Sequence, residues 1–567
     1  MGVGVRNRIG IATGVAGAAA GVLLMTGLPA GEASAAPSRQ QDFGLCPAVQ
    51  QALDPNGDGV FDDGKDDAAL AAAATCTDPA EADANRAYVL RRMKRGPEAS
   101  QAISAALAAN PNSPSARRVS CMILRDNGEL AAAQTACDRA IALRPDWAPA
   151  YVTRSGVKTQ RKDYTGALAD VDRAIALGMT DPDTLTTRGQ ILEEAGRTTE
   201  AMAAFNEAIA ADPNYVVARN AVGRLLFNDG KDQEAIATFG RSIAIKPTAY
   251  AHAWRGRAYV RTKRNAEALA DFTTAGELDP TWAFPHYHRG NLLADTKRPG
   301  EAIAAYDKAI ALDPKWSAPL VERGKVREKN GQAAGALADF NKAIELSPQW
   351  AGAWIARSNF NQERGRYAES MADARQILTF DPKYAAAWNN IGYGLYQAKD
   401  YPGALNAYNQ ALALNPKMQP SLFWKARTLS DLKRYREAVD TYTALLAVNP
   451  NYAWARANRG MLRFDLKEYP GAYDDLAWSI EKLPSYTDAW GVLLLISQNA
   501  GYSVGETAVR IDKASEKAPG LAGPLFAKSV MASMIGDTAL SRAFYDQAIQ
   551  LDPRSPYLKA WGELQRF

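Results

Sequence analysis

The sequence predicts an all-α solenoid of about fourteen helix pairs, because a unit of 34 residues recurs along most of the chain. The unit is clearest at residues 283–316. With Ala283 as position 1, Gly290, Tyr306 and Pro314 occupy positions 8, 24 and 32. The proline of position 32 recurs in steps of 34 residues, with a single step of 33, at Pro213, Pro247, Pro280, Pro314, Pro348, Pro382, Pro416 and Pro450. Such regular spacing predicts one structural unit per repeat.

Small and aromatic side chains alternate within the unit in a way that suits two packed helices. Glycine or alanine at positions 8, 20 and 27 lets the helices approach closely, and an aromatic residue at position 24 fills the remaining space. Proline at position 32 ends the second helix, since it has no N–H and clashes with the preceding turn. Position 8 is glycine at Gly189, Gly223, Gly256, Gly290, Gly324, Gly392 and Gly460, and position 24 is aromatic at Phe205, Phe239, Phe272, Tyr306, Phe340, Tyr408 and Tyr442.

This combination resembles the tetratricopeptide repeat (TPR), a helix–turn–helix unit of the same period. The resemblance implies a right-handed superhelix in which helix A and helix B alternate. We expect the array to span residues 80–553, with the penultimate unit irregular because it carries one extra residue. A capping helix is predicted over residues 554–567, with Tyr557, Trp561 and Leu564 on its buried face.

Residues 1–35 have the pattern of an export signal. Arg6 and Arg8 precede an apolar run, rich in glycine and alanine, over residues 9–28, and an A-x-A motif at residues 33–35 offers a cleavage site. We therefore predict that the signal is removed and that the protein is exported, to the periplasm or outside the cell. An uncleaved membrane anchor is the alternative, for which the run is barely long enough.

Residues 36–79 do not follow the repeat and contain the run DPNGDGVFDDGKDD. Oxygen-bearing residues at alternate positions before Gly59 resemble an EF-hand or dockerin-type calcium loop. Lys65 stands where that family has a bidentate acid, so we expect weak binding, ~10⁻⁴–10⁻³ M. A solvated, turn-rich linker is the alternative. The ligands that the resemblance implies are Asp54, Asn56, Asp58, Val60, Asp62 and Asp66. Asp66 could take part only if the loop has a one-residue bulge.

The four cysteines are predicted to form two disulfides. Cys121 and Cys137 take positions 8 and 24 of one unit, each eight residues from Glu129 in the turn. A rise of about 1.5 Å per residue therefore places them opposite each other on antiparallel helices. Cys46 and Cys76 bracket the run that resembles a calcium loop. An oxidising compartment would keep both pairs joined. Two small buried thiols are the alternative for Cys121 and Cys137.

Position 7 is arginine in eight units, and in five of them position 23 is aspartate. This co-occurrence predicts an Arg–carboxylate link between the two helices of a pair, or to the next repeat. Such links fix register more than they add stability. An anionic ligand held by the row of arginines is the alternative. The five pairs are Arg154 with Asp170, Arg255 with Asp271, Arg323 with Asp339, Arg357 with Asp373 and Arg459 with Asp475.

The TPR resemblance implies a concave groove lined by helix A at positions 2, 5, 9, 12 and 13. The aromatic, Arg and Asn residues found there suit peptide binding, where such residues often carry the affinity. The groove lacks the spaced Lys/Asn set with which one TPR subtype binds the C-terminal carboxylate of chaperones. The predicted partner-binding residues are Asn220, Arg224, Phe227, Tyr250, Arg257, Arg261, Tyr287, Asn291, Lys325, Asn359, Asn389, Tyr393, Tyr396, Phe423, Arg427 and Trp454.

Together these features predict a non-enzymatic, exported scaffold that binds a protein or peptide. A net charge of +4, from 66 basic and 62 acidic residues, argues against nucleic acid as the partner. No motif for nucleotide binding, nucleophilic catalysis or catalytic zinc is present, and weak calcium is the one ligand that we expect. Of the three histidines, His252 and His286 share position 4 in adjacent units. A binder of envelope polysaccharide and an enzyme with a site assembled in the groove remain alternatives.

Overall fold

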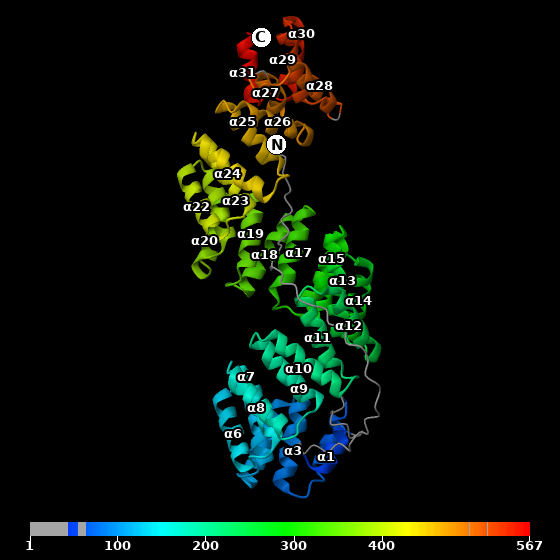
Figure 1. Cartoon of the computed structure of the whole chain (residues 1–567). Coiled ribbons are helices and arrows are strands. Elements are labelled where there is room, and N and C mark those ends of the chain that lie inside the picture. The colour runs from blue at the N-terminus through cyan, green and yellow to red at the C-terminus, as the bar shows by residue number, and fades with distance from the viewer. Residues whose placement is uncertain (1–43, 55–63, 498, 517, 519, 567) are drawn as a thin grey trace. The chain divides into compact units, whose positions relative to one another are not determined.

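In the computed structural model the described residues are 44–54 and 64–566, apart from 498, 517 and 519. Every regular element within them is a helix, which confirms the all-α prediction (Figure 1). The chain divides into two compact units, Met1–Val222 and Gly223–Phe567. The predicted export signal and residues 55–63 of the predicted calcium loop lie outside the described residues.

The first unit contains α1 (Pro47–Leu53), α2 (Asp66–Ala73), α3 (Pro79–Arg92), α4 (Gly96–Ala109), α5 (Pro114–Asp126), α6 (Leu130–Leu143), α7 (Ala148–Gln160), α8 (Tyr164–Ala176), α9 (Pro182–Glu194) and α10 (Thr198–Ala211). The division between the units falls within α11 (Val216–Asn228).

The second unit continues with α12 (Asp232–Ile245), α13 (Ala249–Arg261), α14 (Asn265–Leu278), α15 (Ala283–Asp295), α16 (Pro299–Leu312), α17 (Ser317–Lys329), α18 (Ala333–Leu346), α19 (Ala351–Glu363), α20 (Tyr367–Phe380), α21 (Ala385–Gln397), α22 (Tyr401–Leu414), α23 (Gln419–Asp431), α24 (Tyr435–Val448), α25 (Ala453–Asp465) and α26 (Tyr469–Lys482). It ends with α27 (Thr487–Ser497), α28 (Val504–Ser515), α29 (Ala522–Met534), α30 (Thr538–Leu551) and α31 (Pro556–Gln565).

Consecutive helices pack as pairs, as the repeat predicts. In the first unit α3 packs on α4, α5 on α6, α7 on α8 and α9 on α10, and in the second unit the same pattern runs from α13 with α14 to α25 with α26. The A helices of neighbouring pairs also touch one another, as α17, α19 and α21 do. Helix A of each pair therefore belongs to a continuous layer within its unit, and the face of that layer is called the helix-A surface below.

The two helices of a pair come closest at positions 8 and 24. A Cβ atom added to Gly290 would lie 2.6 Å from Cε1 of the Tyr306 ring, and one added to Gly189 would lie 2.6 Å from Cε1 of Phe205. Real Cβ atoms do not approach a ring carbon so closely, so glycine is required under the aromatic ring. The predicted roles of positions 8 and 24 are thus confirmed.

Helix B ends two residues before the proline of position 32 in the regular repeats; α8, which is followed by Met179, and α28, which ends at Ser515, are exceptions. In the clearest repeat α16 stops at Leu312, and the Asp313 carboxylate accepts the N–H of Lys315 at 3.1 Å. This Asx turn reverses the chain ahead of the next helix A. The same bond forms at Asp212, Asp279, Asp381, Asn415 and Asn449.

The turn between helix A and helix B has a second backbone signature at position 15, where φ is positive. Gly331 there has φ 79°, and Lys297, in the preceding repeat, has φ 61°. Glycine adopts this conformation without steric cost, whereas lysine does so at a cost of ~1 kcal/mol. Lysine nevertheless fills the position at Lys94, Lys162, Lys263, Lys297, Lys399, Lys433 and Lys467.

The N-terminal segment before the repeats contributes two helices that the sequence pattern did not indicate. Helices α1 and α2 pack on each other and α2 packs on α3. Leu45, Val49 and Leu53 are buried in a core that they share with Leu90 of α3. The segment therefore covers the apolar end of the first helix pair.

The C-terminal end departs from the simple pairing. Helix α27 packs mainly on α29 instead of on α28, and α31 packs on α27 and α30. The irregular penultimate unit that the extra residue predicts is therefore present. Trp561 of the capping helix is buried as predicted, but Leu564 is 72% exposed, and Leu558 lies in the core instead. The prediction for Leu564 is wrong because α31 is rotated so that positions 558 and 561 face inward.

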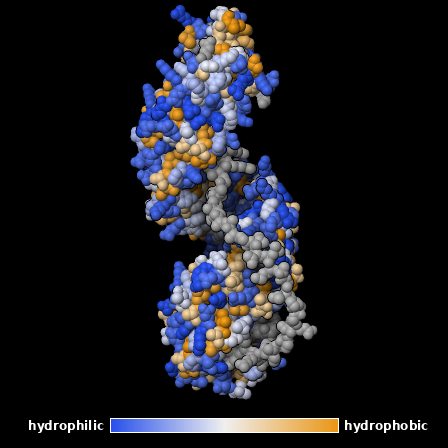
Figure 2. Space-filling model, in the orientation of Figure 1, coloured by the Kyte–Doolittle hydropathy of each residue, from blue (hydrophilic) through white to orange (hydrophobic). Residues whose placement is uncertain are grey.

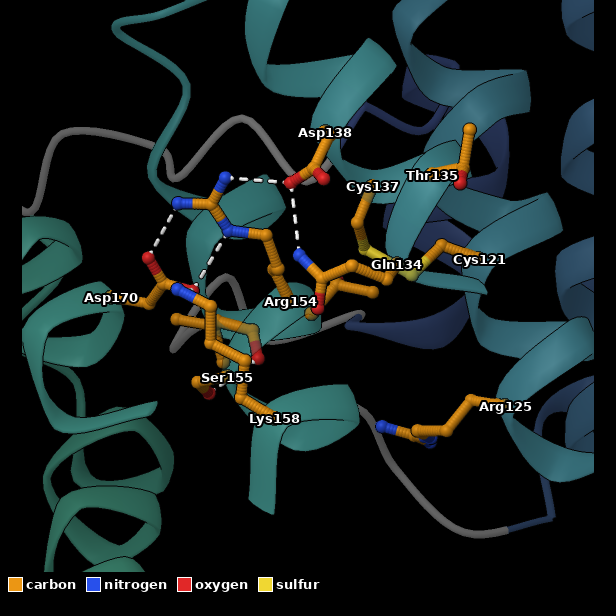
Figure 3. Close-up of a disulfide and its surroundings, with 12 residues drawn as sticks. Cys121, Arg125, Gln134, Thr135, Cys137, Asp138, Arg154, Ser155, Lys158 and Asp170 are labelled. Carbon is orange, nitrogen blue, oxygen red and sulfur yellow. Dashed lines mark hydrogen bonds and ion pairs between the residues drawn. A yellow bond between two sulfur atoms is a disulfide. The ribbon is translucent and has the colours of Figure 1, made fainter. Parts of the chain in front are cut away.

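Both predicted disulfides are present. Cys121 on α5 is joined to Cys137 on α6, with their Cα atoms 5.4 Å apart, and Figure 3 shows the bond between the two helices. Cys46, at the start of α1, is joined to Cys76, which follows α2. The first bond replaces the glycine–aromatic contact of other repeats with a covalent one.

No described helix is both long enough and apolar enough to cross a membrane. Figure 2 shows hydrophobic residues scattered among hydrophilic ones on the visible face.

We expect the Cys121–Cys137 disulfide to stabilise its own repeat and leave distant repeats unchanged. The variant Cys121→Ala/Cys137→Val should lower the free energy of local opening at α5 and α6 by ~3 kcal/mol, the value for a closed loop of about 15 residues. Because a repeat contacts only its neighbours, amide hydrogen exchange at α15–α22 should stay the same. Equal exchange at α5 and α6 in the oxidised and variant proteins would contradict this expectation.

Candidate functional site

The arginines of position 7 are held by the protein's own carboxylates. In the five predicted pairs the guanidinium donates two hydrogen bonds, through Nε and Nη2, to the aspartate of position 23, over 2.6–3.0 Å. All five aspartates are buried, with 3–4% exposure. The link between the two helices of one pair is therefore confirmed. None of these five position-7 guanidinium groups is left over for an external anion.

Four of these five arginines also reach back to helix B of the preceding repeat. Nη1 of Arg154 donates to Asp138 at 2.9 Å, as Figure 3 shows, and Nη1 of Arg357 donates to Asn341 at 2.7 Å. Both acceptors stand at position 25. One guanidinium thus joins three helices from two repeats, and this arrangement is called the arginine clip below. The other clips of this kind join Arg323 to Asp307 and Arg459 to Thr443.

We expect the clip to contribute through its buried carboxylate. Asp339 also accepts from Arg327 at 2.9 Å, so Asp339→Asn leaves the half-buried Arg327 without a counter-charge and Arg323 with only the exposed Asp307. The free energy of opening α17 and α18, measured by hydrogen exchange, should fall by ~3 kcal/mol. The control is Glu345→Gln on the same helix, which breaks the exposed pair with Lys342 and should cost under ~0.5 kcal/mol. Equal losses in the two variants would contradict a special role for the clip.

Part of the predicted groove set gathers into a first aromatic cluster on the helix-A surface of α11, α13 and α15. Its members are Phe227, Tyr250, Trp254, Trp282 and Phe284. Trp282 and Phe284 are stacked with ring centres 5.0 Å apart and planes within 8°, and Trp254 lies 6.0 Å from Phe284. Phe227 meets the edge of Trp254 at 5.5 Å. Trp254 and Trp282 were not among the predicted binding residues, although their sequence spacing from the others could have indicated them.

Arg257 stands within this cluster. Its guanidinium carbon lies 4.2 Å from the centre of the Trp254 ring, 4.7 Å from Phe227 and 5.6 Å from Phe284. Burial and the neighbouring positive charge of Arg261 lower the pKa of Arg257. Among the described residues it makes no hydrogen bond or ion pair, so its N–H donors have no partner there.

The neighbours of Arg257 have partners or are neutral. Nη1 of Arg261 donates to the Phe227 carbonyl at 2.7 Å, and its Nε lies 3.2 Å from the Asp232 carboxylate. Burial, with the charge of Arg257, lowers the pKa of His288 to about 3, so this imidazole is neutral near pH 7. Arg257 is therefore the uncompensated cation of the cluster.

A second aromatic cluster lies further along, on α21, α23 and the start of α25. Tyr393 and Tyr396 lie 4.7 and 5.1 Å from the Trp424 ring, and Phe423 stacks on Tyr452 at 5.5 Å. The Tyr396 hydroxyl donates to Asp431 at 2.7 Å. Trp424, like Trp254, holds position 6 and was missed because the predicted lining positions were 2, 5, 9, 12 and 13.

Other predicted residues take part in bonds within the fold. Asn389 is buried and accepts from Ser421 at 2.9 Å, Asn359 accepts from Asn390 at 2.7 Å, and Asn291 accepts from Tyr306 at 2.8 Å. Lys325 is exposed and pairs with Glu322. Of the remaining predicted residues, Asn220 is buried and Arg224 is half-buried, both on α11, whereas Arg427 is exposed on α23. Two aromatic residues contact other rings: the Tyr287 ring centre lies 4.6 Å from that of Trp316, and the Trp454 ring centre lies 5.6 Å from that of Tyr486.

The predicted calcium loop is described only at its edges. Asp54 is buried, and the Asp66 carboxylate accepts from Nε of Arg92 at 2.7 Å. Asn56, Asp58, Val60 and Asp62 lie outside the described residues, so calcium binding stays a prediction. Within the described ranges, no three His, Cys, Asp or Glu side chains come together as a metal site would require.

Two recesses lie away from both aromatic clusters. One, of about 310 Å³, lies beside the Cys46–Cys76 disulfide and is lined by Glu81, Arg144 and Trp147. The other, of about 450 Å³, lies between α14, α15 and the start of α16.

Three family models described as tetratricopeptide repeat match the chain. They match at residues 192–258 and 395–474, at 283–316, and at 84–148, 158–216 and 362–419, which together is more than half of its length. A comparison with curated proteins finds no match.

Solved structures with a similar fold include the APC/C hetero-tetramer Cut9-Hcn1, at 12% identity and TM-score 0.49, covering 84% of this chain and 95% of that one. The yeast Tom70 structure has 13% identity and a TM-score of 0.39, and the match covers 68% of this chain and 96% of Tom70. A tetratricopeptide repeat protein from Parabacteroides merdae ATCC 43184 has 17% identity and a TM-score of 0.36, and the match covers 44% of this chain and 98% of that protein. At these sequence identities and TM-scores, the similarity to these structures indicates nothing about function.

Proposed function

The chain belongs to the tetratricopeptide-repeat family, and from this premise we propose that it is a non-enzymatic, exported scaffold that holds a protein or peptide segment on its helix-A surface. The repeat fold is typical of proteins that bind other proteins, and an extended layer of helices offers many side chains to an extended ligand. Which residues hold the segment is the specific part of the proposal.

The observation that carries the proposal is the guanidinium of Arg257. A half-buried cation is costly unless hydrogen-bond acceptors satisfy it, and the described residues supply none. An aspartate, a glutamate or a C-terminal carboxylate of a bound segment would pair with its N–H groups through charge-assisted bonds. The rings of Trp254, Phe227 and Phe284 would then exclude water from the pair and contact the apolar atoms beside it.

The second aromatic cluster supplies a further contact region of similar composition. Tyr393, Tyr396 and Phe423 are half-buried, so each presents part of a large side chain at the helix-A surface. Large, stiff aromatic side chains give contact area with little loss of conformational entropy. A segment bound in an extended conformation could use both clusters in turn.

The ring arrangement favours a protein partner over a polysaccharide. A sugar ring stacks on the open face of an aromatic side chain. In the first cluster, however, the Trp282 face is covered by Phe284 at 5.0 Å and by Tyr250 at 6.3 Å. Export is supported by the two disulfides, since such bonds persist in oxidising compartments.

The test is a selection of peptides from a random displayed library, with the oxidised full-length protein as bait. We expect the selected peptides to share a carboxylate beside an apolar residue, and their affinity to fall at least about tenfold in Arg257→Gln, the value of a lost charged hydrogen bond. The matched control is Arg241→Gln, an exposed arginine of helix α12 that lies in no aromatic cluster.

Two results would contradict the proposal. The first is a selection that yields no acidic peptides, and the second is equal binding to the wild type and Arg257→Gln. Loss of binding in Tyr393→Ala/Tyr396→Ala, with an unchanged melting temperature, would extend the bound segment to the second cluster. If an extract of the source cells, digested with protease, still competed for the surface, a polysaccharide would be the partner instead.

A further inference from the structure

The two aromatic clusters are built around the same pair of residues. Helix α13 has Trp254 at position 6 and Arg257 at position 9. Helix α23, five repeats later, has Trp424 and Arg427 at the same positions. No other helix A of the repeats combines these two residue types in its sequence. The combination therefore occurs only in the helices that carry the clusters.

The rings around the two pairs also come from the same positions of the repeat. Position 12 of the preceding helix A supplies Phe227 and Tyr396, whose ring centres lie 5.5 and 5.1 Å from those of the two tryptophans. Position 34 supplies Trp282 and Tyr452, each stacked on a phenylalanine, at 5.0 and 5.5 Å. The second aromatic cluster therefore has the same framework as the first.

The two clusters differ in charge at position 13. In the first cluster this residue is Arg261, whose charge is balanced by Asp232 at 3.2 Å, so Arg257 remains an uncompensated cation. In the second cluster the residue is Asp431, one helical turn after Arg427. The first cluster thus has an excess positive charge, whereas the charges of the second cluster balance.

Arg427 is nevertheless able to donate to a ligand. It is exposed, and among the described residues it forms no ion pair, although the charge of Asp431 acts on it. The Asp431 carboxylate accepts from the Tyr396 hydroxyl at 2.7 Å. Burial and this hydrogen bond raise the pKa of Tyr396 to about 12, so the phenol is neutral near pH 7. An incoming anion is repelled by Asp431, whereas an amide oxygen meets the donors of Arg427 without that repulsion.

The A helices between the two clusters form one continuous series within the second unit. Helix α13 touches α15, and the contacts continue through α17, α19 and α21 to α23. Packed helices lie about 8–10 Å apart, so these five steps cover ~40–50 Å along the layer. An extended segment advances ~3.3 Å per residue and needs ~12–15 residues to pass from one cluster to the other.

We propose that Trp424 and Arg427 form a second binding site for the segment held at Arg257, and that this site takes an apolar residue beside an uncharged amide. The amide belongs to the main chain or to an asparagine or glutamine side chain. The segment lies with its carboxylate at α13 and its neutral part at α23. This inference rests on the proposed function, and the experiment below reads the two sites separately.

The experiment uses the oxidised full-length protein labelled with 5-fluorotryptophan. The fluorine NMR signals of Trp254 and Trp424 are assigned with the variants Trp254→Phe and Trp424→Phe. The probes are the blocked dipeptides N-acetyl-aspartyl-leucinamide and N-acetyl-asparaginyl-leucinamide, which have nearly the same shape and differ in one negative charge. Each signal is followed as each probe is added, so each site yields its own affinity for each probe.

We expect the Trp254 signal to report binding of the aspartyl probe at least about tenfold tighter than that of the asparaginyl probe, because only the first forms a charged pair with Arg257. The Trp424 signal should report binding of the asparaginyl probe at least as tight as that of the aspartyl probe. Asp431→Asn removes the local negative charge with little change of shape. In that variant the Trp424 signal should favour the aspartyl probe about threefold, as for one exposed charge.

Arg427→Gln should weaken both probes at Trp424 at least about tenfold, as for a lost hydrogen bond to a charged group. The matched control is Lys417→Gln, an exposed cation in the turn before α23 that lies in no aromatic cluster. To test the spacing, the two probes are joined by proline spacers, which advance ~3.1 Å per residue. A spacer of ~14 prolines spans the two clusters and should bind at least about tenfold tighter than either probe, whereas ~5 prolines should give no gain.

Three results would overturn the proposal or part of it. A Trp424 signal that neither probe moves, or that responds equally in Arg427→Gln and Lys417→Gln, removes the second site. A Trp424 signal that favours the aspartyl probe in the wild type removes its preference for a neutral amide. A long tandem peptide that binds no tighter than its parts shows that the sites do not share one segment. Failure at Trp254 with a response at Trp424 contradicts the proposed role of Arg257 alone.

Discussion

The rest of the structure depends on the close approach of helix A and helix B at positions 8 and 24. Where the pair is Gly290 under the Tyr306 ring, no side chain fits between them. The repeat of residues 114–147 meets the same constraint with the Cys121–Cys137 bond. In α19 and α20 position 24 is the small Ala374, and position 8 meets position 20 instead, where the Ser358 and Ser370 hydroxyls lie 2.9 Å apart. Different chemistry at one place thus yields the same helix spacing, and the spacing sets which side chains reach the helix-A surface.

The arginine clips act between repeats, whereas the contact at positions 8 and 24 acts within one helix pair. A buried ion pair adds little net stability, since desolvation offsets most of the attraction, but it is costly to misalign. Each clip that reaches position 25 joins both helices of its own pair to the helix B before it. The repeats that carry such a clip are therefore held in register with the repeat before them, as α17 is with α16 through Arg323 and Asp307. The repeats of α11, α13 and α15 have no clip between them, and there the aromatic contacts around Arg257 join the neighbouring A helices.

Much of the fold follows from the sequence because its causes are local or periodic. Proline at position 32 and glycine at position 8 act within one unit, and the Arg154–Asp170 link could be inferred because both residues recur together. The aromatic clusters were only partly predictable. Arg257 was in the predicted set, but its lack of an acceptor depends on what three helices place around it. Leu564 was assigned to the wrong face because a single short helix leaves its rotation to its neighbours.

The packing of α27 on α29 has a consequence for how the chain gains and loses its structure. In a regular solenoid each hairpin closes with contacts between residues that are near in sequence. Here Gly491 meets Phe526, and one core joins residues from Met461 to Trp561. Long segments must be brought together before that core forms, so its contact order is higher than that of a single hairpin. The C-terminal end therefore behaves as one cooperative block, and fraying of the array from that end removes several helices at once.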